Sequence, residues 1–377
     1  MSDIADLSKG IGISKDQLSA DGEPCILYGE LYTKYKSETI KEVISKTNID
    51  NTKLVKSKAN DVIIPCSGET AEEIATARCV LKDDVLLGGD LNIIRLHGYD
   101  GSFMSYQLNG KRKYDIAKVA QGVSVVHLYG EHLKNIKTIN PGLNEQKKIA
   151  NLLSLLDERI STQNKIIEDL KKLKSAISKY LFERKDLFEN KIKLSKVAEL
   201  KNGYAFQSSK YNALGKWKIL TIANVAGERY VKTNECNSII EIPYDIQKHQ
   251  KLEANDILIS LTGNVGRVSL CTEGLFLLNQ RVGLLQLKVS EDREFIYQVL
   301  SFHKFEESMI ACAQGAAQMN IGKGDVENYI LPYSFNKENI NSVASVLKNY
   351  DKYIINEINM LSMLHSQKQY LLRQMFI

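Results

Sequence analysis

Apolar residues recur along residues 144–185 in steps that alternate between four and three, which is the spacing of a heptad repeat. This pattern predicts one helix of about 40 residues, several times the ~11–12 residues of an average helix. Two polar residues, Gln163 and Lys174, interrupt the apolar stripe. The stripe consists of Ile149, Leu153, Leu156, Ile160, Ile167, Leu170, Ile177 and Leu181.

The same stripe recurs about 194 residues later, in residues 336–376, and predicts a second long helix. Its polar interruptions, Glu357 and Lys368, fall at the same places as those of the first stripe. A single heptad stripe is more often the face of a helix packed on a globular core, but two matched stripes favour pairing with each other. The second stripe consists of Val343, Leu347, Tyr350, Ile354, Leu361, Leu364, Leu371 and Met375.

The segments outside the two helices contain short β-rich runs bounded by Gly, Asn, Asp and Ser, and one stretch, residues 291–309, is expected to be helical. Short motifs are shared at the same offset: Ala-Asn-Asp at 59–61 and 254–256, and Ala-Gln-Gly at 120–122 and 313–315. The β-rich runs are residues 26–32, 61–69, 255–263 and 282–290.

The sequence therefore predicts an α+β fold with a pseudo-two-fold internal repeat. Two globular domains alternate with two long helices that pair as an antiparallel coiled coil. The expected ranges are 1–142 for the first globular domain, 143–185 for the central helix, 186–335 for the second globular domain and 336–377 for the C-terminal helix.

Composition adds modest constraints. Hydrophobic content of 44% and charged content of 25% are ordinary for a globular protein, and the net charge of +5 is compatible with a polyanionic partner. Six scattered cysteines without a CxxC pair, and the lack of a signal peptide, predict reduced thiols in the cytoplasm. No apolar run approaches the ~20 residues that span a bilayer, so we expect no membrane association.

Catalytic motifs are missing from the sequence. It contains no GxxxxGK[ST] phosphate loop, no HExxH, no GxSxG and no metal-spaced Cys/His cluster, and its six histidines are dispersed. It also lacks the (Asn/Asp)-Pro-Pro-(Tyr/Phe) tetrad of amino-methyltransferases. These absences predict a binding protein with no catalytic residue, no metal and no cofactor of its own.

Duplex DNA is the predicted partner. A helix of about 40 residues spans about 60 Å and would separate two readers by a fixed distance. Because the two globular domains differ in sequence, we expect an asymmetric target of two half-sites. A solvated loop, or a glutamine that braces a glycine turn, would give the same local patterns. The candidate DNA contacts are Lys111, Arg112, Lys113, Gln121, Tyr204, Gln207, Ser208, Ser209, Lys210, Tyr211, Asn264, Arg267, Gln314 and Lys323.

The chain resembles the specificity subunit of type I restriction–modification enzymes. Residues 141–160 (PGLNEQKKIANLLSLLDERI) resemble the central conserved region of that family. Residues 202–211 (NGYAFQSSKY) resemble the start of a target recognition domain, and residues 120–141 and 313–332 resemble the ends of two such domains. The likeness covers essentially the whole chain.

The resemblance implies that each target recognition domain reads one half of a split DNA sequence and that the helices set the spacer. Two modification subunits, which bind S-adenosylmethionine and methylate adenine, would dock on the globular domains and on the helices through their heptad residues. Restriction/translocase subunits, which use ATP and Mg²⁺, would join them. The alternative is a coiled-coil scaffold whose globular domains bind proteins, and a self-contained nuclease or methyltransferase is disfavoured by the missing motifs.

Overall fold

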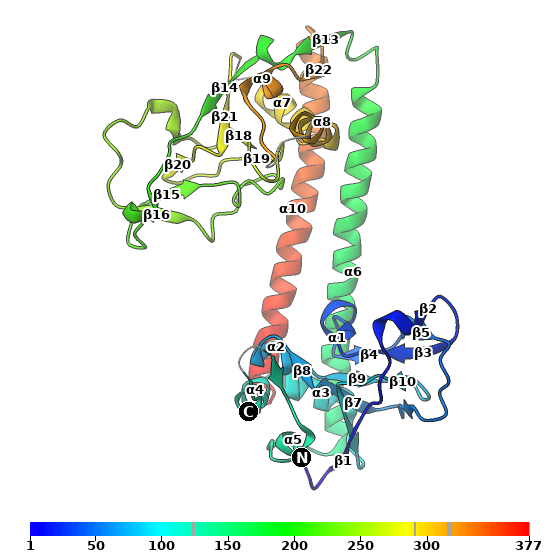
Figure 1. The fold of residues 1–377 in the computed structure, drawn as a ribbon. Helices are drawn as coiled ribbons and strands as arrows, with labels where there is room; N and C mark the ends of the chain where they lie inside the picture. The colour runs from blue at the N-terminus through cyan, green and yellow to red at the C-terminus, as the bar shows by residue number, and fades with distance from the viewer. Residues whose placement is uncertain (123–124, 290–291, 315–318, 377) are drawn as a thin grey trace. The chain divides into compact units, whose positions relative to one another are not determined.

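A computed structural model of the chain describes residues 1–122, 125–289, 292–314 and 319–376. The chain forms two compact units: unit 1 is Met1–Lys165 with Ile358–Ile377, and unit 2 is Ile166–Glu357. Each unit holds one globular domain and parts of both long helices (Figure 1). Parts of the segments named above, at 123–124, 290–291 and 315–318, lie outside the described residues.

The two long helices are α6 (Leu143–Phe182) and α10 (Lys337–Gln374), drawn in green and in orange to red in Figure 1. Strong helix formers such as Leu, Lys, Glu and Gln fill both segments. At the start of α10, the side-chain oxygen of Asn336 accepts a hydrogen bond from the backbone N–H of Glu338 at 2.9 Å, which satisfies one of the unpaired donors of the first turn. All sixteen residues of the two predicted stripes are buried or half-buried.

The helices pair in opposite directions in both units. In unit 1, Leu153, near the start of α6, packs in one cluster with Leu372 and Phe376, near the end of α10. In unit 2 the other halves meet, where Ile177 of α6 packs against the cluster that contains Leu347 of α10. The predicted antiparallel coiled coil is therefore present.

Unit 1 contains two main sheets. Its globular domain packs apolar residues on either side of the first sheet, in two clusters that include Ile63 and Ile64 of the same strand. The first sheet has the order β1 (Ala5–Lys9), β11 (Leu91–Leu96), β7 (Asp61–Pro65), β9 (Arg78–Val80) and β4 (Thr39–Ile40), and the second has the order β2 (Leu18–Ser19), β5 (Ser45–Thr47), β3 (Glu23–Ile26), β10 (Leu86–Leu87) and β6 (Val55–Lys56). A small pair joins β12 (Val126–His127) to β8 (Ser67–Gly68).

Unit 2 repeats this arrangement. Its sheets have the order β14 (Ala198–Asn202), β21 (Val282–Leu287), β18 (Ile257–Ser260), β19 (Val268–Leu270), and β16 (Asn237–Ile239), β15 (Trp217–Leu220), β20 (Phe276–Leu278), β17 (Lys251–Leu252). In both units the second sheet contains a parallel pair in its centre, β3 with β10 and β15 with β20. The internal repeat is therefore a repeat of topology. A further pair joins β13 (Asn190–Lys193) to β22 (Ile330–Tyr333).

Short helices follow the same order in the two units. In unit 1 the strand β11 is followed by α3 (Gly101–Asn109), α4 (Lys113–Val119) and α5 (Gly130–Lys134), and in unit 2 the strand β21 is followed by α7 (Arg293–Leu300), α8 (His303–Ala313) and α9 (Lys323–Glu327). The predicted helical stretch thus forms two helices with a break at Ser301 and Phe302. Unit 1 also holds α2 (Ala71–Ile74).

The expectation of one β-rich run at 26–32 was wrong beyond its first residue. The strand β3 ends at Ile26, and residues Glu30–Thr33 form the helix α1. A carboxylate oxygen of Glu30 accepts the backbone N–H of Leu27 at 3.1 Å, and this local bond closes a turn in place of a strand.

Candidate nucleic-acid interface

The shared Ala-Asn-Asp motif forms the same turn in each unit. Asn60 and Asn255 adopt left-handed backbone conformations, with φ of 84° and 69°. The aspartate that follows then closes the turn. Asp256 Oδ2 accepts a hydrogen bond from the backbone N–H of Glu253 at 2.8 Å, and Asp61 Oδ2 accepts one from the backbone N–H of Lys58 at 2.8 Å. Asparagine tolerates this conformation better than most residues, which explains why the motif recurs at the start of β7 and β18.

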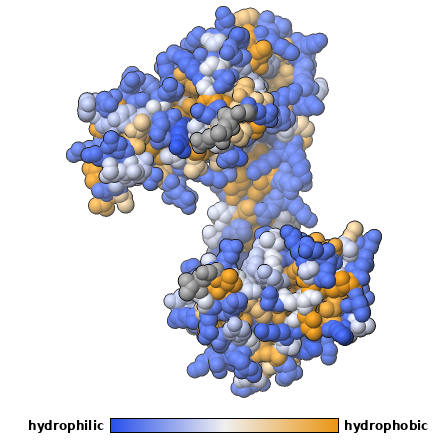
Figure 2. Space-filling view, viewed as in Figure 1, coloured by the Kyte–Doolittle hydropathy of each residue, from blue (hydrophilic) through white to orange (hydrophobic). Residues whose placement is uncertain are grey.

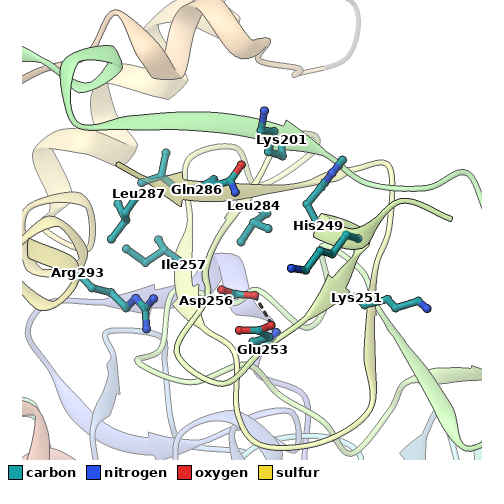
Figure 3. Close-up of a pocket in the computed structure, with 12 residues that line it drawn as sticks. Lys201, His249, Lys251, Glu253, Asp256, Ile257, Leu284, Gln286, Leu287 and Arg293 are labelled. Carbon is teal, nitrogen blue, oxygen red and sulfur yellow. Dashed lines mark hydrogen bonds between the residues drawn. The ribbon is translucent and has the colours of Figure 1, made fainter. Parts of the chain in front are cut away.

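In unit 2 this turn borders a cleft of about 490 Å³, shown in Figure 3. The sheet strands β14, β18 and β21 form one wall, and the segment 248–253 forms another. Basic groups line it from separate parts of the chain: Lys201, Lys248, His249, Lys251 and Arg293. We call this site the basic cleft.

Positive charge in the basic cleft is only partly compensated. Lys201 pairs with Glu199 at 2.7 Å, whereas Lys248 and Lys251 have no ion-pair partner among the described residues. Burial raises the pKa of Asp256, and the nearby Arg293 and the backbone N–H of Glu253 only partly oppose that rise. Cationic side chains in a concave site are suited to hold phosphate oxygens.

The equivalent position in unit 1 carries an ion pair. There, Arg95 of β11 binds Asp61 with two hydrogen bonds, from Nε at 2.9 Å and from Nη2 at 2.7 Å. The side chain of Asp61 is 2% exposed and that of Arg95 is 35% exposed, so the carboxylate is withdrawn from water and its partner is only half-buried. The two globular domains therefore share a backbone plan but present different charged surfaces.

A second cleft of unit 2, of about 690 Å³, gathers most of the residues predicted from 202–211. The rings of Tyr204 and Phe206 pack in a tilted arrangement with centroids 4.9 Å apart, and the Tyr204 hydroxyl donates to Asp245 Oδ1 at 2.9 Å. The opposite wall is the loop 239–245, in which Tyr244 is fully exposed. We call this site the aromatic cleft, and its predicted members are Tyr204, Gln207, Ser209, Lys210 and Tyr211, whereas Ser208 is exposed outside the lining.

The basic run of the first domain is less available than the sequence indicated. Lys111 is exposed in a turn, but Lys113 begins the helix α4, so the predicted loop ends earlier. Arg112 is 17% exposed at its side chain and pairs with Asp115 at 3.3 Å. Only the two lysines of this run lack an ion-pair partner among the described residues.

Other predicted contacts are dispersed over the two domains. Gln121 and Gln314 are exposed, and the backbone of Gln121 pairs with that of His127. Asn264 is exposed in the turn after β18, while Arg267 pairs with Glu306 at 3.3 Å. Lys323 pairs with Glu199 at 2.7 Å. The structure thus brings the 204–211 group together and leaves the remaining candidates apart.

Sequence reasoning missed the basic cleft, because its residues are far apart in the chain. The segment KHQK at 248–251 was a local signal, but its link to Lys201 and Arg293 depends on strand pairing. Sequence reasoning also missed a second apolar stripe on the long helices. This stripe remains exposed when the two seams pair. This exposed stripe consists of Leu152, Leu155, Ile166, Leu173 and Tyr180 on α6, and Val346, Tyr353, Met360, Met363 and Tyr370 on α10.

Figure 2 shows apolar colour on the visible surface of the long helices, in agreement with this exposed stripe. Within the described residues, no helix is long and apolar enough to cross a membrane. In the same part of the chain, no group of three or more His, Cys, Asp or Glu side chains could hold a metal ion.

Comparison with known proteins gives a consistent result. A family model described as "Type I restriction modification DNA specificity domain" matches the chain twice, at residues 1–172 and 188–360. The "Type I restriction enzyme MjaVIII specificity subunit" of Methanocaldococcus jannaschii is 27% identical over 382 aligned residues, which cover 93% of this chain and 85% of that protein. The "Putative type I restriction enzyme MjaX specificity subunit" of the same organism is 29% identical and covers 72% of this chain and 67% of its own length.

Solved structures share the fold. The S subunit of a type I restriction–modification system from M. genitalium superposes with a TM-score of 0.63 at 18% identity, over 100% of this chain and 94% of that one. A chain from a study of complex assembly and conformational transition of the type I R-M system gives a TM-score of 0.58 at 14% identity, over 98% and 95% of the two chains.

Proposed function

Because the chain belongs to the type I restriction–modification DNA specificity family, we propose that it reads a split DNA sequence for that kind of enzyme. Each globular domain would read one half-site, with the reading modules spanning residues 1–142 and 186–335. The chain would supply recognition and no catalytic group.

The repeated domain topology is the observation that carries this proposal. Two copies of one sheet order, each followed by a long helix, provide two readers of one kind in a single chain. The readers differ at equivalent places: Arg95 neutralises Asp61 in unit 1, while the basic cleft is only partly neutralised in unit 2. Two related but unlike surfaces account for two different half-sites.

We assign different tasks to the two clefts of unit 2. The basic cleft would hold backbone phosphates, because its lysines and arginine carry positive charge that phosphate oxygens attract. The aromatic cleft would face base edges, since Gln207 and the tyrosine hydroxyls can both donate and accept hydrogen bonds. In the first domain the exposed Lys111 and Gln121 and the half-buried Lys113 remain the proposed contacts.

The exposed stripe of the long helices is the proposed docking surface for two modification subunits. The seam residues predicted for docking are occupied by helix pairing, so they would contribute only indirectly. Leu173 is 47% exposed and Tyr353 is 61% exposed, and aromatic and aliphatic groups of this kind are enriched where proteins associate. Those subunits would bring S-adenosylmethionine, and restriction/translocase subunits would bring ATP and Mg²⁺, in the cytoplasm.

Methylome sequencing of cells that express the chain with its modification subunit tests the proposed function. We expect adenine methylation at one asymmetric motif with two defined halves and a fixed unread spacer. An undivided motif, or none, would contradict the proposal and favour a protein-binding scaffold.

Salt-dependent DNA binding by the assembled methyltransferase tests the basic cleft. Lys248→Ala with Lys251→Ala should weaken binding to all sequences alike and lower the salt slope by about 1 per lost phosphate contact. Lys171→Ala with Lys172→Ala, on the exposed face of α6, is the matched control and should leave the slope unchanged. An equal slope in both variants would remove the basic cleft from the DNA interface.

Co-purification tests the docking surface. Leu173→Asp with Tyr353→Asp should abolish co-elution with the modification subunit while the thermal unfolding of the chain stays unchanged. The control Gln367→Asp introduces a charge at an exposed polar position of α10. Full co-elution of the double variant would show that docking occurs elsewhere.

A further inference from the structure

Unit 1 contains a buried cluster of charges where the two long helices meet the globular domain. Lys368 Nζ of α10 lies 2.5 Å from Asp157 Oδ1 of α6 and 2.5 Å from Glu38 Oε2 of the globular domain. The three side chains are between 7% and 11% exposed. A single lysine thus connects both helices and the domain.

The globular domain also holds the helix aspartate directly. Asp157 Oδ2 accepts hydrogen bonds from the Tyr106 hydroxyl at 2.7 Å and from Ser37 Oγ at 3.0 Å. Burial opposes ionisation of Asp157, but the Lys368 ammonium and these hydrogen bonds hold its pKa below the usual range. Asp157 is therefore bonded through both carboxylate oxygens at a junction that it shares with Glu38 and Lys368.

Unit 2 contains a counterpart of this cluster. Lys174 Nζ of α6 lies 2.6 Å from Asp351 Oδ1 of α10. The other oxygen of Asp351 accepts hydrogen bonds from Gln298 at 2.6 Å and from Arg229 at 2.8 Å, both of the globular domain. Arg229 in turn binds Glu294 at 2.6 Å. Again two helices and one domain meet at one ion pair.

The two ion pairs are related by the internal repeat. Asp157 and Asp351 are 194 residues apart, and so are Lys174 and Lys368. Each helix therefore carries one aspartate and one lysine of these pairs, 17 positions apart, and one antiparallel alignment brings opposite charges together in both units.

Other alignments would separate these charges. A parallel alignment of the repeats would set Asp157 against Asp351 and Lys174 against Lys368. An antiparallel slip of one heptad would set Asp157 against Leu361 or Met375. Buried charges without partners are strongly unfavourable, whereas an apolar seam alone tolerates slips of a whole heptad.

We propose that the pairs Asp157–Lys368 and Lys174–Asp351 are positioning residues, which select one alignment of the long helices and one orientation of each globular domain upon them. This inference rests on the proposed function for its consequence: the pairs would restrict the spacer length that the chain accepts between half-sites. A buried polar group that specifies register at some expense of stability is a known device of coiled coils.

Replacement of one pair by apolar residues separates positioning from stability. In Lys174→Met with Asp351→Leu, Arg229 keeps its partner Glu294, so no buried charge is orphaned and the thermal unfolding temperature should be maintained. The assembled methyltransferase is then given DNA with fixed half-sites and spacers one base pair shorter or longer. We expect methylation of the sites with altered spacers, relative to methylation of the site with the native spacer, to rise about tenfold. This factor corresponds to the loss of roughly one pairwise coupling between contacting residues.

The control is Glu168→Gln with Lys172→Met, which removes an exposed ion pair of α6, with 65% and 69% of the two side chains exposed. It should leave spacer preference unchanged. Unaltered spacer preference in the apolar variant as well, with normal folding, would overturn the proposal.

A spin-label measurement tests the alignment without DNA. Labels at Lys172→Cys and Lys352→Cys, in a chain with Cys236→Ser and Cys312→Ser, should give one narrow distance distribution in the parent chain and a broad or split one in the apolar variant. A narrow, unshifted distribution in that variant would refute the alignment role. Loss of bipartite methylation by the parent chain would instead count against the proposed function, so the two failures are distinguishable.

Discussion

At the scale of single residues, the repeated motifs mark backbone geometry more than chemistry. Ala-Asn-Asp recurs because Asn60 and Asn255 occupy left-handed turns and the following aspartates accept backbone N–H groups. The two asparagine side chains nevertheless differ in their hydrogen bonds. Asn60 donates to the carbonyl of Tyr99 at 2.8 Å and accepts from the N–H of Gly101 at 2.5 Å.

Substitution of the two asparagines separates conformation from hydrogen bonding. Asn255→Val should lower the free energy of unfolding by about 1–2 kcal/mol, because a branched residue resists the left-handed region, whereas Asn255→Gly should be nearly neutral. Asn60→Gly should cost about 1–3 kcal/mol, since it removes two half-buried hydrogen bonds. Urea unfolding of the full chain, followed by circular dichroism, measures all three, and equal effects of the two glycine variants would contradict this account.

The cysteines allow a second prediction at this scale. Burial raises the pKa of Cys25 and Cys66 to about 11 and that of Cys79 and Cys271 to about 12, so these four thiols stay protonated at neutral pH. Cys312 is exposed on α8. Alkylation at pH 8, mapped by mass spectrometry, should label Cys312 first and the four buried thiols only after denaturation. Early labelling of Cys79 would show that the core of unit 1 opens readily.

At the scale of elements, each long helix has two apolar faces, one buried and one exposed. The seam face is buried by pairing, as at Leu153 and Leu347, both of which are fully buried. The exposed stripe consists of residues next to the seam residues on the same helical turns, such as Leu152 and Leu155. A helix that is apolar on two sides indicates two successive partners, the first being the other helix of the same chain.

Alanine at neighbouring leucines should distinguish the two faces. Leu153→Ala removes a fully buried side chain beside Phe103 and Leu372, so unit 1 should lose about 2–5 kcal/mol of stability. Leu155 is 54% exposed, and Leu155→Ala should change stability by less than about 0.5 kcal/mol while it weakens co-elution with the modification subunit. Thermal unfolding and co-purification of the same two proteins give the comparison; destabilisation by both would mean that the stripe also packs within the chain.

At the scale of the whole molecule, any change in helix length must respect both ion pairs. An insertion in α6 alone, between Asp157 and Lys174, would leave only one of the two pairs in register. Equal insertions in α6 and in α10, between Asp351 and Lys368, would keep both pairs. We therefore expect that an insertion in one helix alone does not suffice to lengthen a spacer.

Paired seven-residue insertions, after Leu170 and after Glu357, should lengthen the unread spacer by about one to three base pairs. Seven residues add about 10 Å of helix, which is the length of about three base pairs and sets the upper value. The helical twist of DNA favours smaller changes of the spacer. Methylome sequencing should show unchanged half-sites. The α6 insertion alone is the control and should impair methylation; an unchanged spacer in the paired variant would disprove the role of the helices in spacing.

The sequence was sufficient for the long helices, their seam and the repeat, because heptad periodicity is a local property that many residues confirm together. It also located Lys174 and Lys368 as breaks in the seam. Their partners could not be predicted, since Asp157 and Asp351 sit beside the seam and resemble ordinary solvated charges. The basic cleft could not be predicted either, because the tertiary fold brings Lys201 and Arg293 to one cleft and no local sequence pattern records it.

The buried ion pairs would also restrict which recognition modules can be exchanged between chains of this kind. If chains of this kind acquire new specificity by exchanging a whole recognition module, the incoming module must supply the hydroxyl of Tyr106 and the carboxylate of Glu38, or groups that replace them, at the junction with the helices. A module that recognises its DNA well but carries an apolar residue at position 106 would leave Asp157 without the hydrogen bond that Tyr106 donates. Which modules can be exchanged would therefore depend on this inner junction as well as on the bases that they read.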